Sequence, residues 1–304
     1  MKKRVERSTL KLVLITIGVV LLVLFVFIPV LFSLFDGSRL GNVALIPIEG
    51  TITGNGAQGF GASSVSSKDI VEFIEEAEDN PQIKVLLLEI NSPGGSAVAS
   101  DEIAAAVKKA RKPVVALIRE AGASGAYWIA SASDYIIANR MSITGSIGVV
   151  SSYLEFSGLM EDYGVGYEQL IAGENKDMGT PFKKLAPQER MIMQKKLDTI
   201  HHYFIEEVAV NRKLDISEVE ALATGEFYLG VEALHFGLID ALGDKDTVEE
   251  FIQQNYNLED IDYVLYQRES GFLEALTGVF SGLSFHVGEG IGSAFVKQQL
   301  QVWI

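Results

Sequence analysis

The feature that most constrains this chain is a charge-free apolar segment of 24 residues, Leu12 to Phe35, near the N-terminus. As an α-helix it would be about 36 Å long, against a bilayer hydrocarbon core of about 30 Å. Residues 1–11 carry a net charge of +4. Because positive flanks stay in the cytoplasm, we expect a single-pass anchor in the cytoplasmic membrane, with residues 1–11 inside and the rest of the chain outside.

A cleaved signal peptide is the alternative interpretation of this segment. The apolar run is longer than the usual core of a signal peptide, and no small-x-small site such as Ala-x-Ala follows closely. We therefore expect an uncleaved transmembrane anchor over residues 12–35, a polar linker over residues 36–42, and an extracytoplasmic domain from residue 43.

The charge and the composition exclude several classes of function. Residues 12–304 carry a net charge of −19, and a body this acidic, without a basic stripe, argues against nucleic acid as a partner. The absence of cysteine excludes disulfides, thiolate nucleophiles and thiolate metal sites. The four histidines, His201, His202, His235 and His286, show no metal-ligand spacing. We therefore expect no metal and no other cofactor.

Short apolar strands alternate with helices from residue 43 onward, which is typical of parallel βαβ units in an α/β fold. The expected strands are residues 43–48, 85–90, 114–118, 135–139 and 167–172, and helices are expected over 68–79 and 96–109. Further helices are expected over 187–212 and near 216–223, 230–236 and 246–255. We expect this domain to end at residue 266, before an apolar, glycine-rich tail over residues 267–304.

Two turns that follow expected strands are candidates for chemistry. The sequence Asn-Ser-Pro-Gly-Gly at 91–95 allows backbone N–H groups to face a ligand, although an ordinary strand-to-helix turn explains it equally well. Ser124 lies between a strand and a helix of small residues, where developing negative charge is favoured, but a serine there is also a common helix N-cap. Both turns are expected at the same edge of the sheet, because the carboxyl ends of parallel strands meet there.

A nucleophilic serine needs a base, and none of the four histidines is well placed to be one. Lysine is the remaining candidate, as in the Ser–Lys hydrolases. A lysine accepts a proton only as the free amine, so burial or a nearby cation must lower its pKa from about 10.4 to roughly 7 to 8. The residue pattern alone does not select one lysine. Lys176 follows an expected strand, but a solvated loop position explains it as well.

Four motifs resemble, in order, those of the protease IV and signal peptide peptidase A family in its short bacterial form. They are NSPGGS, ASGAYWIASASDYI, ITGSIGV and AGENKDMGTPF, within a similarity that covers roughly residues 43–245. The resemblance implies the fold of the Clp protease proteolytic subunit and the crotonases, a βαβ superhelix with extra C-terminal helices. This agrees with the alternation of strands and helices.

The resemblance also implies roles for individual residues. Ser124 matches the nucleophile, Lys176 the general base, and Ser146 a serine that orients the lysine amine, while the N–H groups of Gly95 and Gly125 would form the oxyanion hole. The sequence differs from the common family pattern next to these positions, with Ala126 and Trp128 after the serine and Glu174-Asn175 before the lysine. We expect these differences to affect substrate preference more than activity.

The function implied by the resemblance is a membrane-anchored serine endopeptidase that works through an acyl-enzyme. Its substrates would be residual signal peptides and other hydrophobic, membrane-derived peptides, and it would assemble as a dome-like homo-oligomer, an octameric ring, at the bilayer. Two alternatives remain, a crotonase-like acyl-CoA enzyme and a catalytically inactive membrane scaffold, because a fold by itself does not determine a function.

Overall fold

The computed structural model describes residues 15–20, 22–23, 27, 41–56 and 64–268. Most of the expected anchor (12–35) and linker (36–42) and the tail from residue 269 lie outside the described residues. Within the described part of the chain, no helix is both long enough and apolar enough to cross a membrane. The chain divides into two compact units, Met1–Leu265 and Tyr266–Ile304, and the whole of the central sheet belongs to the first.

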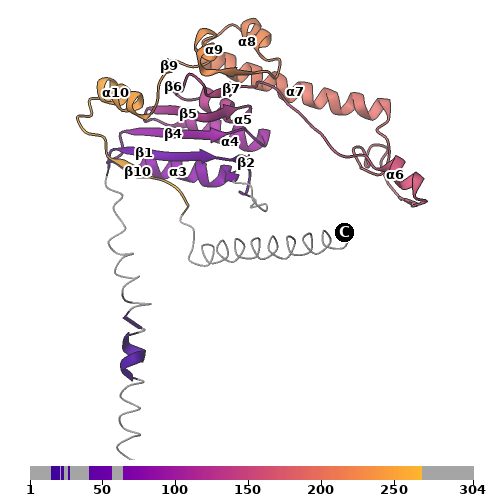
Figure 1. Ribbon diagram of the computed structural model, residues 1–304, viewed down its shortest axis with the longest axis horizontal. Helices are drawn as coiled ribbons and strands as arrows, with labels where there is room; N and C mark the ends of the chain where they lie inside the picture. Colours follow the sequence, from indigo (N-terminus) through magenta and orange to yellow (C-terminus); the bar gives the residue numbers. More distant parts are fainter. Residues whose placement is uncertain (1–14, 21, 24–26, 28–40, 57–63, 269–304) are drawn as a thin grey trace, which may run out of the picture. The chain divides into compact units, whose positions relative to one another are not determined.

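A mixed sheet of eight strands forms the centre of this unit (Figure 1). Its main path has the order β10-β1-β4-β5-β6-β9, and all neighbours on this path pair in parallel. These strands are β10 (Tyr263–Leu265), β1 (Val43–Glu49), β4 (Val85–Ser92), β5 (Val114–Ala123), β6 (Tyr135–Ala138) and β9 (Ala241–Leu242). The sequence prediction of an α/β fold with parallel strands is therefore confirmed.

Strand β5 changes partner along its length, and this change positions the candidate site. Ile90 of β4 pairs with Ile118, but Ser92 pairs with Gly122, so β5 carries a bulge between these positions. Before the bulge β5 pairs with β6, and after it β5 pairs with β7 (Ile143–Gly145). Strand β8 (Phe227–Leu229) extends this part antiparallel to β7, and β2 (Thr51–Thr53) pairs with β3 (Ser64–Ser66) in a separate small sheet.

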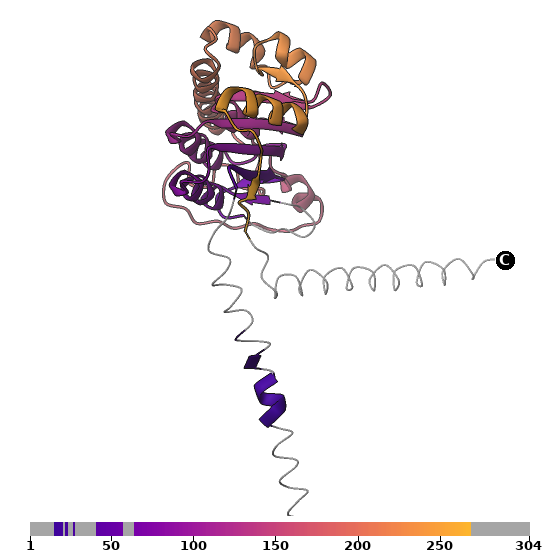
Figure 2. The same ribbon diagram turned by 90° about the vertical axis from the view of Figure 1, so that its left-hand side faces the viewer.

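Helices cover both faces of the sheet because the strand residues alternate between two apolar surfaces (Figure 2). One surface packs on α10 (Lys245–Tyr256), whose Val248 and Ile252 join the buried side chains of β1, β4, β5 and β6. The other surface lies under α3 (Ser67–Asp79), α4 (Ala97–Lys109) and α5 (Gly125–Ser131). Each fully buried aliphatic side chain contributes about 1.5 to 3 kcal/mol.

The C-terminal helices occur close to where the sequence predicts them. They are α7 (Pro187–Arg212), α8 (Ile216–Leu222), α9 (Gly230–His235) and α10. Pro187 starts α7 at a position where a missing N–H costs nothing, and Lys213, with a φ of 56°, ends it. We call residues 41–149 and 187–265 the body of the chain. Only the second half of α7 is buried against the rest of the body, through residues such as Phe204 and Val208.

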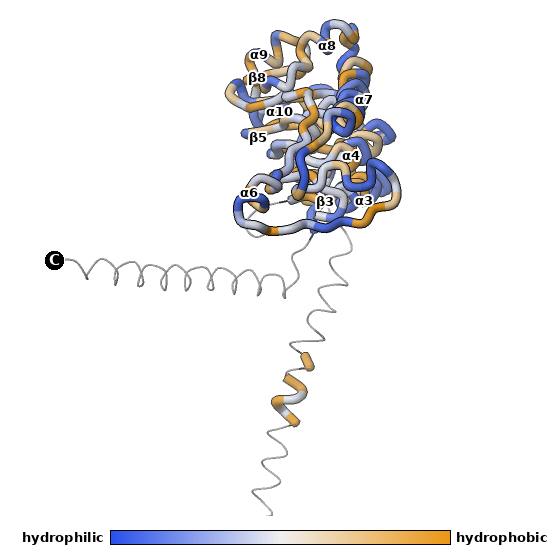
Figure 3. Tube along the Cα trace, turned by 90° about the vertical axis from the view of Figure 1, so that its right-hand side faces the viewer, coloured by the Kyte–Doolittle hydropathy of each residue, from blue (hydrophilic) through white to orange (hydrophobic). Residues whose placement is uncertain are grey.

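The expected strand over residues 167–172 is wrong. These residues are exposed and belong to an extension of residues 150–186, which we call the arm. The arm contains the short helix α6 (Ser157–Asp162), and none of its residues is buried. It precedes α7 in the chain and lies at the end of that helix that is away from the sheet (Figure 1), and hydrophobic residues lie along it (Figure 3). Apolar composition predicted a buried strand, but this segment pairs with no strand among the residues that the structure describes.

Candidate active site

Ser124 occupies the turn between β5 and α5, and it adopts a conformation that is rare for residues other than glycine. Its φ is 54° and its ψ is −125°, and a backbone strained in this way costs of order 1–3 kcal/mol. Ser66 and Ser96 cap α3 and α4 with their hydroxyl groups, whereas the Ser124 side chain makes no capping hydrogen bond. Its hydroxyl thus has no hydrogen-bond partner in the described part of the chain and lies on a strained turn, which an ordinary helix cap does not explain.

The turn at Ser124 is held from both sides. The Ser124 N–H donates to the Gly145 carbonyl of β7 (2.8 Å), and the Ser124 carbonyl accepts from the Trp128 N–H (3.0 Å). All residues of α5 are buried, and the Tyr127 hydroxyl donates to the Leu238 carbonyl at 2.8 Å. Burial raises the pKa of this hydroxyl well above its usual value, so it stays a donor. The helix after Ser124 is therefore fixed in the core.

The two N–H groups predicted to form an oxyanion hole lie close together beside Ser124. A Cβ atom built on Gly125 would be 3.4 Å from the Gly95 nitrogen. Gly94, with a φ of +99°, lies against the turn, since a Cβ there would come within 2.8 Å of the Gly125 nitrogen and 3.0 Å of the Ser124 Cβ. The Gly125 N–H is the first of α5 and has no partner in its own helix.

The loop that carries Gly95 is fixed by Ile52 of β2. The Ile52 N–H donates to the Gly94 carbonyl (2.9 Å), and the Ile52 carbonyl accepts from the Ser96 N–H (2.8 Å). These bonds leave the Gly95 N–H without an acceptor among the described residues. An oxyanion hole is built from backbone N–H groups that lie close together beside a nucleophile and have no partner of their own, which is the combination found at Gly95 and Gly125 among the described residues.

Ser146 lies next to Ser124 because β5 and β7 pair up to Ala123 and Gly145. It also has a positive φ of 50°, which the Glu226 carbonyl supports by accepting from the Ser146 N–H at 2.9 Å. The Ser146 hydroxyl donates to the Gly225 carbonyl at 3.2 Å. The structure therefore brings Ser124, Ser146, Gly95 and Gly125 to one edge of the sheet.

Lys176 does not lie with these residues in the same chain. It is an exposed residue of the arm, in a tight turn where its N–H donates to the Gly173 carbonyl at 3.1 Å. Its amine has no hydrogen bond or ion pair with the part of the chain that the structure describes. The structure thus separates the predicted base from the other predicted site residues.

A cluster of ion pairs ties the Lys176 turn to the start of α7. The Lys183 Nζ bonds to Asp177 Oδ2 at 2.7 Å and to Glu189 Oε1 at 2.8 Å, and both carboxylate side chains are less than 10% exposed. Glu189 also accepts from the Ala186 N–H at 2.9 Å. The two carboxylates raise the pKa of Lys183, and the Lys183 ammonium lowers the pKa of Glu189. This cluster was not predicted from the sequence, although Asp177 follows the predicted base directly.

The length of α7 shows how far this cluster is from Ser124. Trp128, one helical turn after Ser124, stacks on Phe204 with ring centroids 4.8 Å apart. Glu189 precedes Phe204 by fifteen residues in α7, a rise of about 22 Å along the helix axis. Lys176, beside the cluster, therefore lies at the other end of α7 from the turn that holds Ser124.

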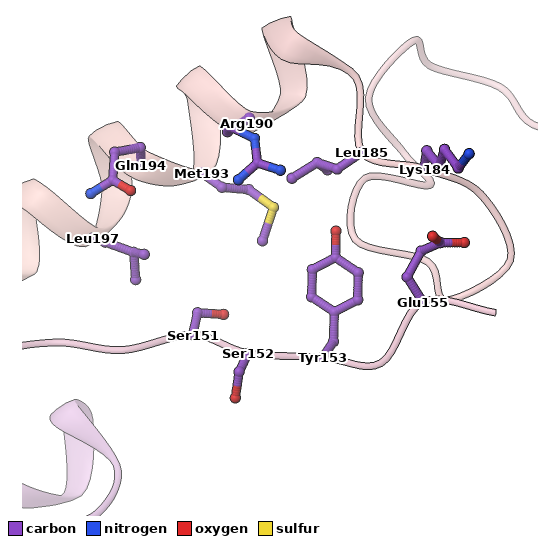
Figure 4. A pocket seen from close by; sticks show the side chains of 10 residues that line it. All are labelled: Ser151, Ser152, Tyr153, Glu155, Lys184, Leu185, Arg190, Met193, Gln194 and Leu197. Carbon is purple, nitrogen blue, oxygen red and sulfur yellow. The ribbon is translucent and has the colours of Figure 1, made fainter. Parts of the chain in front are cut away.

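The arm and the first half of α7 enclose a hollow of about 580 Å³ (Figure 4). Tyr153 and Met193 face each other across it, and Arg190 lies above them. Ser124 and Ser146 do not line it, so the hollow is separate from the candidate site. The hollow is open, and the other described residues of the chain do not cover the apolar side chains that face it.

Comparison with known proteins shows which family the chain belongs to. Residues 106–259, half of the chain, match peptidase family S49, and they include Ser124, Ser146 and Lys176. A putative protease of Methanocaldococcus jannaschii is 33% identical over 86% of this chain and 82% of its own length. A putative signal peptide peptidase SppA of Enterococcus faecium is 30% identical over 87% and 80%, and protease 4 of Haemophilus influenzae is 33% identical over 71% and 35%.

A solved structure of a 1510-N membrane-bound stomatin-specific protease aligns with a TM-score of 0.47 at 16% identity, over 75% of this chain and 95% of that one. The family match decides between the alternatives that the sequence left open, in favour of a peptidase over an acyl-CoA enzyme or an inactive scaffold. The chain belongs to peptidase family S49, the family of signal peptide peptidase A and protease 4, and is a serine peptidase.

Proposed function

We propose that the chain is a membrane-anchored serine endopeptidase in which Ser124 is the nucleophile and Lys176 the general base. The observation that carries the proposal is the free hydroxyl of Ser124, on a strained turn beside the N–H groups of Gly95 and Gly125. A helix-capping role does not need the strain, whereas a nucleophile needs a hydroxyl that points away from its own backbone.

The proposed reaction is acyl transfer in two steps. The Ser124 Oγ attacks the peptide carbonyl carbon, its proton passes to the Lys176 amine, and the carbonyl oxygen becomes an oxyanion between the two N–H groups. The C–N bond then breaks, and the leaving amine takes the proton from the lysine. Water attacks the resulting ester in the same way, which releases the acid and restores Ser124.

We propose further that Lys176 reaches Ser124 from a neighbouring copy of the chain. The arm is separated from its own Ser124 by most of the length of α7, and it exposes large apolar side chains such as Leu154, Tyr163 and Leu170. A contact of this head-to-tail kind closes into a ring when the rotation between copies allows it. The proposed assembly is the dome-like octamer that the family resemblance implies, in which Ser146 orients the incoming amine.

The proposed substrates are residual signal peptides and other hydrophobic peptides from the membrane. Residues 12–35 support an anchor, and the basic residues before them support an orientation with the peptidase domain outside the cytoplasm. An anchored site meets such peptides where they are released. The bilayer and the peptide are thus the two proposed partners besides further copies of the chain.

The test is hydrolysis of a hydrophobic signal-peptide mimic by the full chain in detergent. We expect Ser124→Ala and Lys176→Ala each to lower kcat by at least about 1,000-fold, as the loss of a catalytic group does in serine peptidases. Because a lysine base acts only as the free amine, kcat/KM should rise with pH. Wild-type turnover in either variant would show that the proposed pair is wrong.

Mixing the two inactive variants tests the origin of the base. If each site combines Ser124 of one copy with Lys176 of another, random co-assembly leaves about one quarter of the sites intact. The mixture should then regain about a quarter of the wild-type activity, whereas Ser124→Ala mixed with the double variant should regain none. A mixture as inactive as its parents would place both groups in one chain.

A further inference from the structure

A pocket of about 390 Å³ lies between α4, α5 and α7, and Trp128 in its lining is one helical turn after the candidate nucleophile. Trp128 lines it and donates its backbone N–H to the carbonyl of Ser124 (3.0 Å), so one wall begins one helical turn from the hydroxyl. Val98 lines it as well, three residues after Gly95, whose N–H is half of the proposed oxyanion hole. A peptide with its carbonyl at this hole passes next to the pocket.

The walls of the pocket are apolar and aromatic. Trp128 is 5% exposed and is held by its stacking on Phe204, while Val98 is 68% and Tyr203 57% exposed. The indole nitrogen of Trp128 is buried and has no hydrogen-bond partner among the described residues. Side chains as exposed as Val98 and Tyr203 next to a pocket leave apolar surface for a ligand to cover.

The other lining residues give the pocket a negative charge. Asp101, Glu206 and Glu207 line it, and the lining includes no lysine or arginine. Glu207 is paired with Lys108, and Glu206 bonds to His202 at 3.2 Å. Asp101 has no such partner in the described part of the chain. The pocket therefore combines apolar walls with at least one carboxylate that lacks a counter-charge.

We infer that this pocket binds a lysine or arginine side chain of the peptide substrate. These side chains have a long apolar stem, which fits against Val98, Trp128 and Tyr203, and a cationic end, which Asp101 and its neighbouring carboxylates attract. The inference rests on the proposed function and narrows its substrate class to apolar peptides with a cation near the cleaved bond. Signal peptides are such peptides, because basic residues precede their apolar core.

Two peptides that differ at one position test this inference. Both carry the same apolar sequence, one with lysine and one with Nε-acetyl-lysine, which keeps the apolar stem and removes the charge. For the wild-type full chain in low salt, we expect kcat/KM to be about 3- to 10-fold higher for the lysine peptide, the range of one or two exposed ion pairs. The difference should lie in KM and shrink with added salt.

Variants identify the carboxylates. We expect Asp101→Asn to lower the preference by about half, and Asp101→Asn with Glu206→Gln and Glu207→Gln to remove it. Asp246→Asn, an exposed substitution on α10 across the sheet, should keep the wild-type preference. Equal rates for the two peptides in the wild type, or equal preferences in the Asp101 and Asp246 variants, would overturn the inference.

Binding to the Ser124→Ala chain separates this inference from the proposed function. Fluorescence anisotropy of the labelled peptides does not require hydrolysis. If the Ser124→Ala chain binds the lysine peptide more tightly but the wild type cleaves neither peptide, the pocket is supported and the proposed function fails. If the wild type cleaves both peptides and binding shows no preference, the proposed function stands and the pocket inference fails.

Discussion

The end of the sheet around Ser124 and the arm around Lys176 differ in almost every physical respect. Every residue of α5 is buried, and the Ser124 turn is bonded to β7 and to its own helix. The arm has no buried residue, and its apolar side chains, such as Leu170 at 95% exposure, face outward. The first region is packed within the chain itself, whereas the second exposes apolar side chains that the described part of the chain does not cover.

This difference indicates how the proposed activity is controlled. Ser124, the proposed nucleophile, and the N–H groups proposed as oxyanion donors are held by the core of the chain itself, so their arrangement does not depend on the proposed assembly. The proposed base lies on a part of the chain that the core does not stabilise. If the base arrives from a neighbouring copy, an unassembled chain has a nucleophile that nothing activates, and proteolysis is confined to the assembled form.

The largest expected effect contrasts the cores of the two regions. Phe204→Ala removes the ring that stacks on Trp128, and we expect it to lower the free energy of unfolding by about 3 to 5 kcal/mol. Leu170→Ala in the arm should change it by less than about 0.5 kcal/mol. Denaturant unfolding of the full chain in detergent measures both. Similar losses in the two variants would show that the arm belongs to the same cooperative unit.

Two glycines with positive φ provide the second contrast. In Gly94→Ala the new Cβ would lie 2.8 Å from the Gly125 nitrogen, so the N–H groups proposed as oxyanion donors must move. A displacement of these donors by about 1 Å lowers kcat/KM by about 100-fold. Gly164→Ala in the arm meets no atom within 4 Å, and we expect a loss of at most a few fold. Peptide hydrolysis measures both, and equal losses would remove Gly94 from the site.

The fold of the body could be predicted from the sequence because local patterns and global packing agree there. Buried strands such as Val85–Ser92 have continuous apolar runs, and α7 begins at a proline that marks it. The arm could not be predicted, since the apolar residues 167–172 look the same whether their partner is a strand or another chain. The apolar pattern of a sequence predicts which residues are buried, but it does not identify the part of the structure that buries them.

The candidate site could be predicted only in part, for a related reason. The motifs select Lys176 as well as Ser124, Ser146, Gly95 and Gly125. The last four come together because the paired strands β4, β5 and β7 end next to one another. The separation of Lys176 from Ser124 depends on the path of the arm and on the length of α7 between them. The cluster of Asp177, Lys183 and Glu189 is a tertiary contact between short polar residues, which carries no periodic signal in the sequence.

The ion pairs of Lys183 with Asp177 and Glu189 hold the turn that contains Lys176. Lys183→Met leaves two nearly buried carboxylates without their cation, and we expect the arm to loosen and kcat/KM to fall by about tenfold through misplacement of Lys176. Limited proteolysis should cut the arm faster while unfolding of the body is unchanged. Lys184→Met, one residue further and exposed, is the matched control, and equal effects in both would exclude a positioning role.

The pKa shifts in the cluster give this prediction a pH dependence. The pKa of Glu189 is lowered by Lys183, so its contribution to the arm is present above the usual carboxyl pKa and is lost as the pH falls through the lowered value. The pKa of Lys183 is raised by Asp177 and Glu189, so its contribution is lost only as the pH rises through the raised value. Proteolysis of the arm should therefore be slowest around neutral pH, and a rate independent of pH from 3 to 9 would contradict the cluster's role.

The smallest expected effect tests whether the body stores strain where the proposed chemistry occurs. Ser124→Gly removes the hydroxyl and relieves the strained φ of 54°, while the more flexible unfolded chain offsets part of the gain, so we expect the variant to be more stable than Ser124→Ala by about 1 kcal/mol. Both should be inactive. Thermal unfolding compares the stabilities of the two variants. Because both lack the hydroxyl, the difference between them reports the effect of the backbone conformation at residue 124. If Ser124→Ala proved the more stable of the two, the turn would be relaxed, and its shape would then follow from the packing of α5 rather than from a requirement of catalysis.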